Sequence, residues 1–246
     1  MKHLIVLLLA AMLVACNNQP TNQPNNKPQT TKKQQQKQPK KKQLTAVPVN
    51  GVDISHHNTV AWDSLKNCDI SFVYIKAAEG KTYKDPKRLE NYRKAKKHYS
   101  VGFYIYWRPD ISGKDHYNNF IEATKGCPTD LPPVLDIEKG LVPRDNAKLK
   151  KIVKEVEEFT KLYMKDHKVK PIIYTWYEFA IKIHKLNPSY KYWLLISPNI
   201  VRNPHKKVYV DSYSRAPWVI LQFGKWNFGT GDIDLNYGKL ESIKKG

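Results

Sequence analysis

Short apolar runs alternate with longer amphipathic stretches through most of this 246-residue chain, and this alternation limits the folds open to it. Eight runs rich in β-branched and aromatic residues recur after residue 50. Several are apolar almost without interruption, which is typical of strands covered on both faces, as in parallel sheets. The predicted strands are residues 51–55, 71–77, 101–107, 133–138, 171–176, 192–197, 218–223 and 232–236.

Helical patterns fill the gaps between the first of these strands. The predicted helices are residues 86–99, 114–125, 146–167 and 177–186. The last three strands then follow one another closely, and the final gap is too short for the helical crossover that parallel neighbours need. We therefore predict an α/β fold, an irregular TIM-like (β/α)5(β)3 barrel that forms a single domain.

The chain begins with a segment that resembles an export signal. Lys2 and His3 precede an apolar run, residues 4–14, which is too short to span a bilayer as a helix. The run ends in Ala15-Cys16. A small residue directly before a cysteine resembles the lipobox of bacterial lipoproteins, in which the cysteine is lipidated after cleavage. We predict a lipoprotein signal peptide over residues 1–16 with lipidation at Cys16; an ordinary signal peptide is the alternative.

Residues 17–50 are rich in Asn, Gln, Pro, Thr and Lys, with seven lysines and no acidic residue. Such a segment cannot bury enough apolar surface to fold, so we predict a disordered tether. The folded domain is then residues 51–246. Because no wall-binding repeat accompanies the tether, we expect an exported lipoprotein of the cell envelope, attached to the outer membrane of a Gram-negative bacterium.

The folded part is basic. It carries 34 basic and 22 acidic residues, a net charge of +12. This charge favours polyanionic partners such as nucleic acid or cell-wall polymer, although a solvated lysine surface explains most of it. The chain has no nucleic-acid recognition motif, and export also argues against that partner. We predict a monomer, since one barrel with one groove needs no second copy.

Two cysteines remain in the exported domain. Cys68 and Cys127 each precede a predicted strand, which places both at the same end of the barrel. Disulfides persist in exported proteins. A disulfide between them and a pair of free thiols are both consistent with the sequence.

Acidic residues gather at strand ends, although they are depleted in strands generally. Strand 51–55 contains Asp53, and strand 133–138 ends in Asp136 and Glu138. Asp232 and Asp234 belong to strand 232–236, and we predict that they also lie near the carboxyl end of their strand. Catalytic groups of α/β barrels lie at the carboxyl ends of the strands.

Asp136 and Glu138 share one face of their strand because they are two residues apart. Neighbouring carboxylates disfavour each other's ionisation, so one of them can stay protonated near neutral pH. A protonated carboxyl group is the proton donor that glycoside hydrolysis requires. The alternative is that these acids face outward and pair with lysines.

Several motifs occur in an order that resembles glycoside hydrolase family 25, a family of lysozymes. The resemblance covers nearly all of residues 51–240 and implies the (β/α)5(β)3 barrel and β-1,4-N-acetylmuramidase activity on peptidoglycan, with no cofactor. The motifs are Asp53-Ile54-Ser55, residues 70–80 (ISFVYIKAAEG), Val101-Gly102-Phe103-Tyr104, residues 131–138 (LPPVLDIE), Ile173-Tyr174-Thr175, Gln222 and Asp234-Leu235-Asn236.

The resemblance also implies roles for single residues. Glu138 would be the general acid, and Asp136 would hold the substrate's 2-acetamido group or support Glu138. Asp53 and Asp234 would position water or give electrostatic support. The family's pattern further indicates substrate-binding residues in the groove, for which barrel packing is the alternative. They are Tyr104, Tyr106, Tyr174, Gln222 and Trp193.

The chain departs from the family's pattern at the groove. His56-His57-Asn58 stands where tryptophan and glutamine are common, Ala78 replaces a threonine, and Ile105 replaces a frequent histidine. We read the two histidines as rim residues and predict no metal, because two adjacent histidines alone make a poor site. Two other functions stay open. One is a non-catalytic peptidoglycan-binding lipoprotein on the same barrel, and the other is a glycosidase for chitin-like chains.

Overall fold

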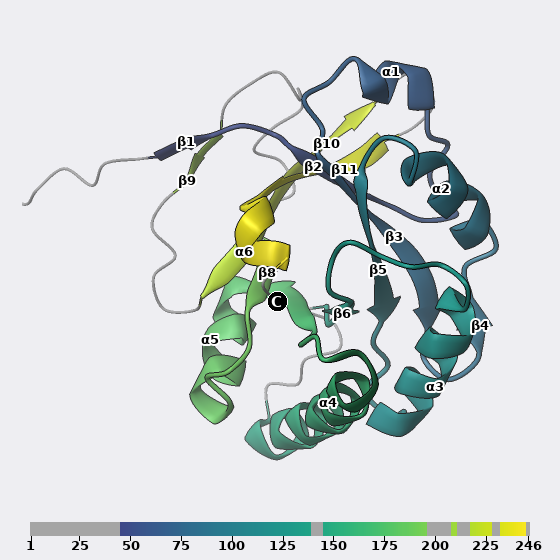
Figure 1. The fold of residues 1–246 in the computed structure, drawn as a ribbon. Coiled ribbons are helices and arrows are strands. Elements are labelled where there is room, and N and C mark those ends of the chain that lie inside the picture. The colour runs from purple at the N-terminus through teal and green to yellow at the C-terminus, as the bar shows by residue number, and fades with distance from the viewer. Residues whose placement is uncertain (1–44, 139–144, 196–207, 211–216, 228–231, 245–246) are drawn as a thin grey trace, which may run out of the picture. The chain divides into compact units, whose positions relative to one another are not determined.

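In a computed structural model, the eight predicted strands form one closed barrel (Figure 1). The structure describes residues 45–138, 145–195, 208–210, 217–227 and 232–244. Each barrel strand pairs with the next, and the last pairs with the first. In this order they are β2 (Gly51–Ile54), β3 (Phe72–Glu79), β5 (Ser100–Tyr106), β6 (Val134–Asp136), β7 (Ile172–Trp176), β8 (Tyr192–Leu195), β10 (Trp218–Asn227) and β11 (Asp232–Gly238).

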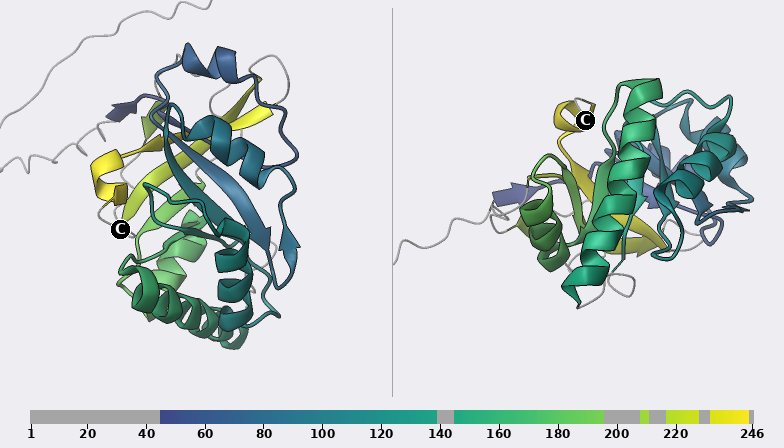
Figure 2. Two further views of the ribbon diagram at one scale, coloured as in Figure 1. Left: turned by 45° about the vertical axis from the view of Figure 1, so that its right-hand side comes forward. Right: turned by 90° about the horizontal axis from the view of Figure 1, so that it is seen from below.

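A helix follows each of the first five barrel strands, so the predicted (β/α)5(β)3 arrangement is confirmed. These helices are α1 (Trp62–Lys66), α2 (Arg88–Ala95), α3 (Gly113–Thr124), α4 (Asn146–His167) and α5 (Tyr177–Leu186). Figures 1 and 2 show α2 to α5 on the outside of the strands. The short α1 was not predicted, because its five residues bury only Leu65. A last short helix, α6 (Leu240–Lys244), follows β11.

The last strand runs opposite to the others. Neighbouring strands from β2 round to β10 are parallel, whereas β11 is antiparallel to both β10 and β2. The placement of Asp232 and Asp234 at a carboxyl strand end was therefore wrong. They lie at the start of β11, and the reversed direction brings this start to the carboxyl ends of the other strands.

Two apolar layers hold the barrel together. Side chains alternate along β3, so that Phe72 and Tyr74 belong to the inner layer, while Val73 and Ile75 belong to the layer beneath the helices. Both layers are almost fully buried, which explains why the strands are apolar with little interruption. The buried inner layer comprises Phe72, Tyr74, Leu131, Val134, Ile172, Tyr174, Trp193, Val219, Ile220 and Ile243.

The longest helix forms where its pattern predicts it. Asp145 begins α4 by accepting a hydrogen bond from the Ala147 amide at 2.8 Å, as a helix N-cap does. Every third or fourth residue is then buried against the barrel and α3, including Ile152, Val156 and Phe159. Along the chain this helix follows β6, the strand that carries Asp136.

The folded unit begins earlier than predicted. The predicted signal peptide (residues 1–16), Cys16 and the predicted tether as far as residue 44 lie outside the described residues. Residues 45–50, expected at the end of the tether, are ordered. β1 (Thr45–Val47) pairs with β9 (Val208–Val210), Val49 is buried, and Asn50 hydrogen-bonds to Gly238. None of the described helices combines the length and hydropathy that crossing a bilayer requires.

Candidate active site at the mouth of the barrel

A cavity of about 250 Å³ lies where the acidic residues were predicted to meet. All four of the predicted catalytic carboxylates line it, and they come from three segments of the chain. A larger hollow of about 480 Å³ lies between α3, α4 and the loop before β6, but among the described residues that line it Asp130 is the only acid. The first cavity is lined by Asp53, Tyr104, Val134, Asp136, Glu138, Tyr174, Trp193, Leu195, Gln222, Gly224, Lys225 and Asp234.

Asp136 and Glu138 both face this cavity, while Ile137 between them is buried on the opposite side. Asp136 is only 8% exposed, and its Oδ1 atom is buried with no hydrogen-bond partner among the described residues. Burial raises the pKa of Asp136 well above its usual range, and the charges of Glu138 and Asp53 raise it further. Glu138 is exposed, two residues after the end of β6 at Asp136, so the strand is shorter than the predicted 133–138. The two carboxyl groups therefore differ in solvation.

Asp53 and Asp234 are direct partners across the β2–β11 pairing. Burial raises the pKa of Asp53 well above its usual range, and the neighbouring Asp234 raises it further. Burial also raises the pKa of Asp234 to about 6, although the Lys225 ammonium, 3.9 Å from Asp234 Oδ1, acts in the opposite direction. Because like charges are held together here, the pair retains a proton at higher pH than free carboxyl groups would.

Two amide side chains bind Asp53 from the barrel interior. Gln222 Nε2 donates to Asp53 Oδ2 at 2.9 Å, and Asn236 Nδ2 donates to the same oxygen at 2.7 Å. Sequence reasoning did not assign Asn236 a role. Its position two residues after Asp234 was the available signal, since this spacing puts both side chains on one face of β11.

The predicted groove residues divide into two groups. Tyr104, Tyr174, Gln222 and Trp193 line the cavity. Tyr106 is not part of that lining; its hydroxyl group lies 3.4 Å from Glu138 Oε2. Burial raises the pKa of Tyr106 to about 12, and the Glu138 charge contributes, so the hydroxyl stays protonated and can donate to that carboxylate.

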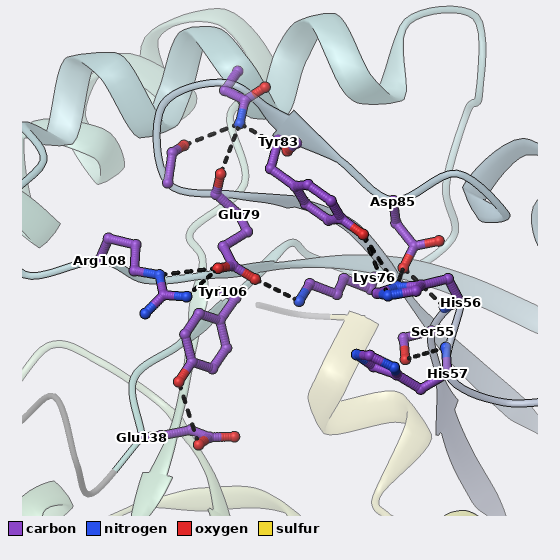
Figure 3. Close-up of polar contacts among 12 residues, drawn as sticks. Ser55, His56, His57, Lys76, Glu79, Tyr83, Asp85, Tyr106, Arg108 and Glu138 are labelled. Atoms are coloured by element: carbon purple, nitrogen blue, oxygen red, sulfur yellow. Dashed lines mark hydrogen bonds and ion pairs between the residues drawn. The ribbon is translucent and has the colours of Figure 1, made fainter.

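Cationic side chains surround the Tyr106 ring (Figure 3). Lys76 Nζ and Arg108 Cζ lie 5.1 Å and 5.0 Å from the ring centroid, within cation–π range. Glu79 holds both cations, because its carboxylate accepts from Lys76 Nζ at 2.8 Å and from Arg108 Nε at 2.9 Å. This cluster was not predicted, and it fixes the side chain that touches Glu138.

The two histidines after β2 lie beside this cluster (Figure 3), but neither lines the cavity. His56 Nδ1 lies 2.7 Å from the fully buried carboxylate of Asp85. The centroid of the His57 ring lies 3.8 Å from that of His56, with the two ring planes tilted by 40°. Among the residues that the structure describes, no group of three or more His, Cys, Asp or Glu side chains is arranged to hold a metal ion.

Cys68 and Cys127 are free thiols, so the disulfide considered from the sequence is not formed. They precede β3 and β6, and β5 lies between these strands. Two strand spacings are about 10 Å, whereas bridged cysteines need Cα atoms within about 7 Å of each other. A shared end of the barrel is therefore too weak a criterion for pairing.

Comparisons with known proteins agree with this geometry. A family model described as glycosyl hydrolases family 25 matches residues 52–225. Lysozyme M1 of Streptomyces globisporus is 40% identical over 99 residues, which cover 37% of this chain and only 33% of that protein. The structure of a muramidase from Trichobolus zukalii has 27% identity and a TM-score of 0.61, over 80% of this chain and 97% of that one. The structure of a family GH25 lysozyme from Aspergillus fumigatus has 26% identity and a TM-score of 0.60, with the same coverage.

Proposed function

The chain belongs to glycosyl hydrolases family 25, and we propose that it is a lysozyme that cleaves the β-1,4 bond between N-acetylmuramic acid and N-acetylglucosamine in peptidoglycan. The observation that carries this proposal is the convergence of Asp53, Asp136, Glu138 and Asp234 on one cavity. Carboxyl groups in unlike surroundings are what acid–base cleavage of a glycosidic bond requires. The names of the similar proteins, a lysozyme and a muramidase, support the same substrate class.

In this proposal Glu138 donates the proton. It lies exposed at the mouth, where a glycosidic oxygen can reach it, and Tyr106 holds one of its oxygen atoms. The proton passes from the Glu138 carboxyl group to the leaving oxygen as the bond to the anomeric carbon breaks. Glu79, Lys76 and Arg108 support this step indirectly by fixing the Tyr106 ring.

The other three acids act on the sugar that carries the anomeric carbon. Asp136, whose buried Oδ1 has no described partner, binds the 2-acetamido group. Asp234 is ionised above about pH 6 and takes a proton from the attacking water, which ionised Asp53 beside it positions. Tyr104 and Tyr174 form the wall against which the sugar ring packs.

A cleavage assay with Glu138→Gln tests the mechanism. Purified peptidoglycan is treated with the wild type, with Glu138→Gln, and with Glu178→Gln as a control that neutralises an exposed carboxylate on α5. We expect the wild type and the control to clear the suspension equally, and Glu138→Gln to be about 10²- to 10⁴-fold slower, because it cannot donate a proton. Borohydride reduction of the products should identify muramic acid as the sugar at the new reducing ends.

Each alternative function gives a different result in this assay. Sedimentation with peptidoglycan but no cleavage by the wild type would indicate a wall-binding protein. Glucosamine at the new reducing ends, or faster cleavage of chitin oligomers, would indicate another glycosidase. Equal clearing by the wild type and Glu138→Gln would refute the assignment of the acid.

We also propose that the enzyme is a monomeric lipoprotein of the cell envelope, anchored through Cys16 to the outer membrane. The support is the short apolar segment that ends in Ala15-Cys16, followed by residues whose composition suits a tether. Such an anchor would hold the barrel within reach of the wall.

A further inference from the structure

The carboxyl group of Asp53 has two oxygen atoms in different surroundings. Oδ2 accepts two hydrogen bonds from the barrel interior, at 2.9 Å from Gln222 Nε2 and at 2.7 Å from Asn236 Nδ2. Asp53 also lines the cavity. With Oδ2 engaged in this way, Oδ1 is the oxygen that can act on a substrate.

The orientation of the Asn236 amide is determined by a tryptophan. Trp193 Nε1 lies 2.9 Å from Asn236 Oδ1, and an indole N–H group can only donate a hydrogen bond. The amide oxygen must therefore face Trp193, and the NH₂ group must face Asp53. Trp193 is 2% exposed and Asn236 is fully buried, so bulk water does not compete for either group.

A second branch reaches the same oxygen atom from β10, where Gln222 is the cross-strand partner of Asn236. The Tyr174 hydroxyl donates to Gln222 Oε1 at 2.7 Å, and this bond directs Gln222 Nε2 toward Asp53. Burial raises the pKa of Tyr174, so its hydroxyl keeps the proton that it donates. Two N–H donors then converge on Oδ2, and a proton bound to Asp53 belongs on Oδ1, toward the cavity.

We propose that Trp193 and Asn236 are positioning residues, which hold Asp53 so that Oδ1 alone takes part in the reaction. Tyr174 and Gln222 form the second branch of the same support. This inference rests on the proposed function, in which the carboxyl group of Asp53 takes part in the reaction. It gives Trp193 a task other than the sugar contact expected from the sequence.

The test is a double-mutant cycle in the full chain. Trp193→Phe keeps an aromatic ring but removes the N–H donor, Asn236→Ala removes the amide, and the third variant combines both. Trp218→Phe, a partly exposed tryptophan outside the cavity lining, is the matched control. Steady-state rates on soluble peptidoglycan fragments are measured for all variants between about pH 4 and pH 9, and thermal unfolding confirms that each is folded.

We expect each single variant to lower kcat by about 10- to 100-fold, because a misplaced reacting group costs rate more than binding. KM should change little. The double variant should be no slower than Asn236→Ala, because Trp193 acts through Asn236. The apparent pKa of the acid limb of the pH–rate profile should rise by about half a unit in each folded variant of Trp193 and Asn236. The reason is that the lost hydrogen-bond donors no longer stabilise the ionised form of Asp53. Trp218→Phe should match the wild type.

Additive losses in the double variant, or lower rates with an unchanged pH profile, would overturn the inference and leave only a packing role. If Trp193→Phe does not fold, Tyr174→Phe replaces it, since it removes one hydroxyl group and keeps the ring. The same upward shift is expected there, and its absence would again contradict the proposal. A wild type that does not cleave peptidoglycan would refute the proposed function itself, and this inference with it.

Discussion

Replacing Asp234 by asparagine should stabilise the protein at alkaline pH, although it should impair the site. In the folded state the pKa of Asp234 is about 6, against an ordinary value of 3.8. The folded state therefore binds this proton more tightly than the unfolded chain, and the stability that this provides is present below about pH 4 and lost as the pH rises through 6. A difference of about two units corresponds to about 3 kcal/mol of unfolding free energy at pH 8. Asparagine has nearly the same shape as aspartate and no charge, so Asp234→Asn should raise the unfolding free energy at pH 8 by this amount.

Urea unfolding of the wild type and Asp234→Asn at pH 4 and pH 8 measures the effect. At pH 8 the variant should gain about 3 kcal/mol, or about 6–12 °C in Tm for a domain of this size. At pH 4 the two proteins should be nearly equal. Asp110→Asn, which neutralises an exposed carboxylate, should show no such dependence on pH. If Asp234→Asn raised the unfolding free energy equally at both pH values, or lowered it at pH 8, the reasoning would be refuted. Either result would show that the negative charge of Asp234 does not destabilise the folded state at pH 8.

Two further predictions concern the barrel interior and the anchor. Gly51→Ala should destabilise the domain by about 1–3 kcal/mol in urea unfolding, because its methyl group would overlap the buried Phe72 ring; unchanged stability would show that this end of the barrel is loosely packed. Cys16→Ala should move the protein from the membrane fraction to the soluble periplasmic fraction, and should abolish metabolic labelling with a fatty acid. Continued labelling of the variant would refute lipidation at Cys16.

The sequence predicted the barrel because its strands are covered on both faces, which leaves a clear apolar pattern. It did not reveal β1, β4 (Tyr83–Lys84) or β9, since a pairing of two or three residues leaves no periodicity to detect. It also did not reveal the direction of β11. Strand direction follows from how the chain turns and pairs, and a strand's own residues carry little information about it.

The four carboxylates of the site could be predicted because strand ends converge in a barrel. The roles of Asn236 and Arg108 were not predicted, since they depend on hydrogen-bond partners far away in the chain, such as Glu79, which is 29 residues from Arg108. The partner of the Asn236 amide, Asp53, precedes it by 183 residues. The choice between a Cys68–Cys127 disulfide and two free thiols stayed open from the sequence, because a shared end of the barrel does not fix the distance between two residues.

The pairing of β2 with β11 has a consequence for when this protein can act. The proposed catalytic residues Asp53 and Asp234 belong to the first and last strands of the barrel, and only the pairing of these strands brings Asp53 to Asp234 and Asn236. A chain still being synthesised has not yet docked its last strand, so Asp53 does not yet lie beside Asp234. We therefore expect hydrolytic activity to appear only once β11 has docked against β2, and to be absent from a partly folded chain.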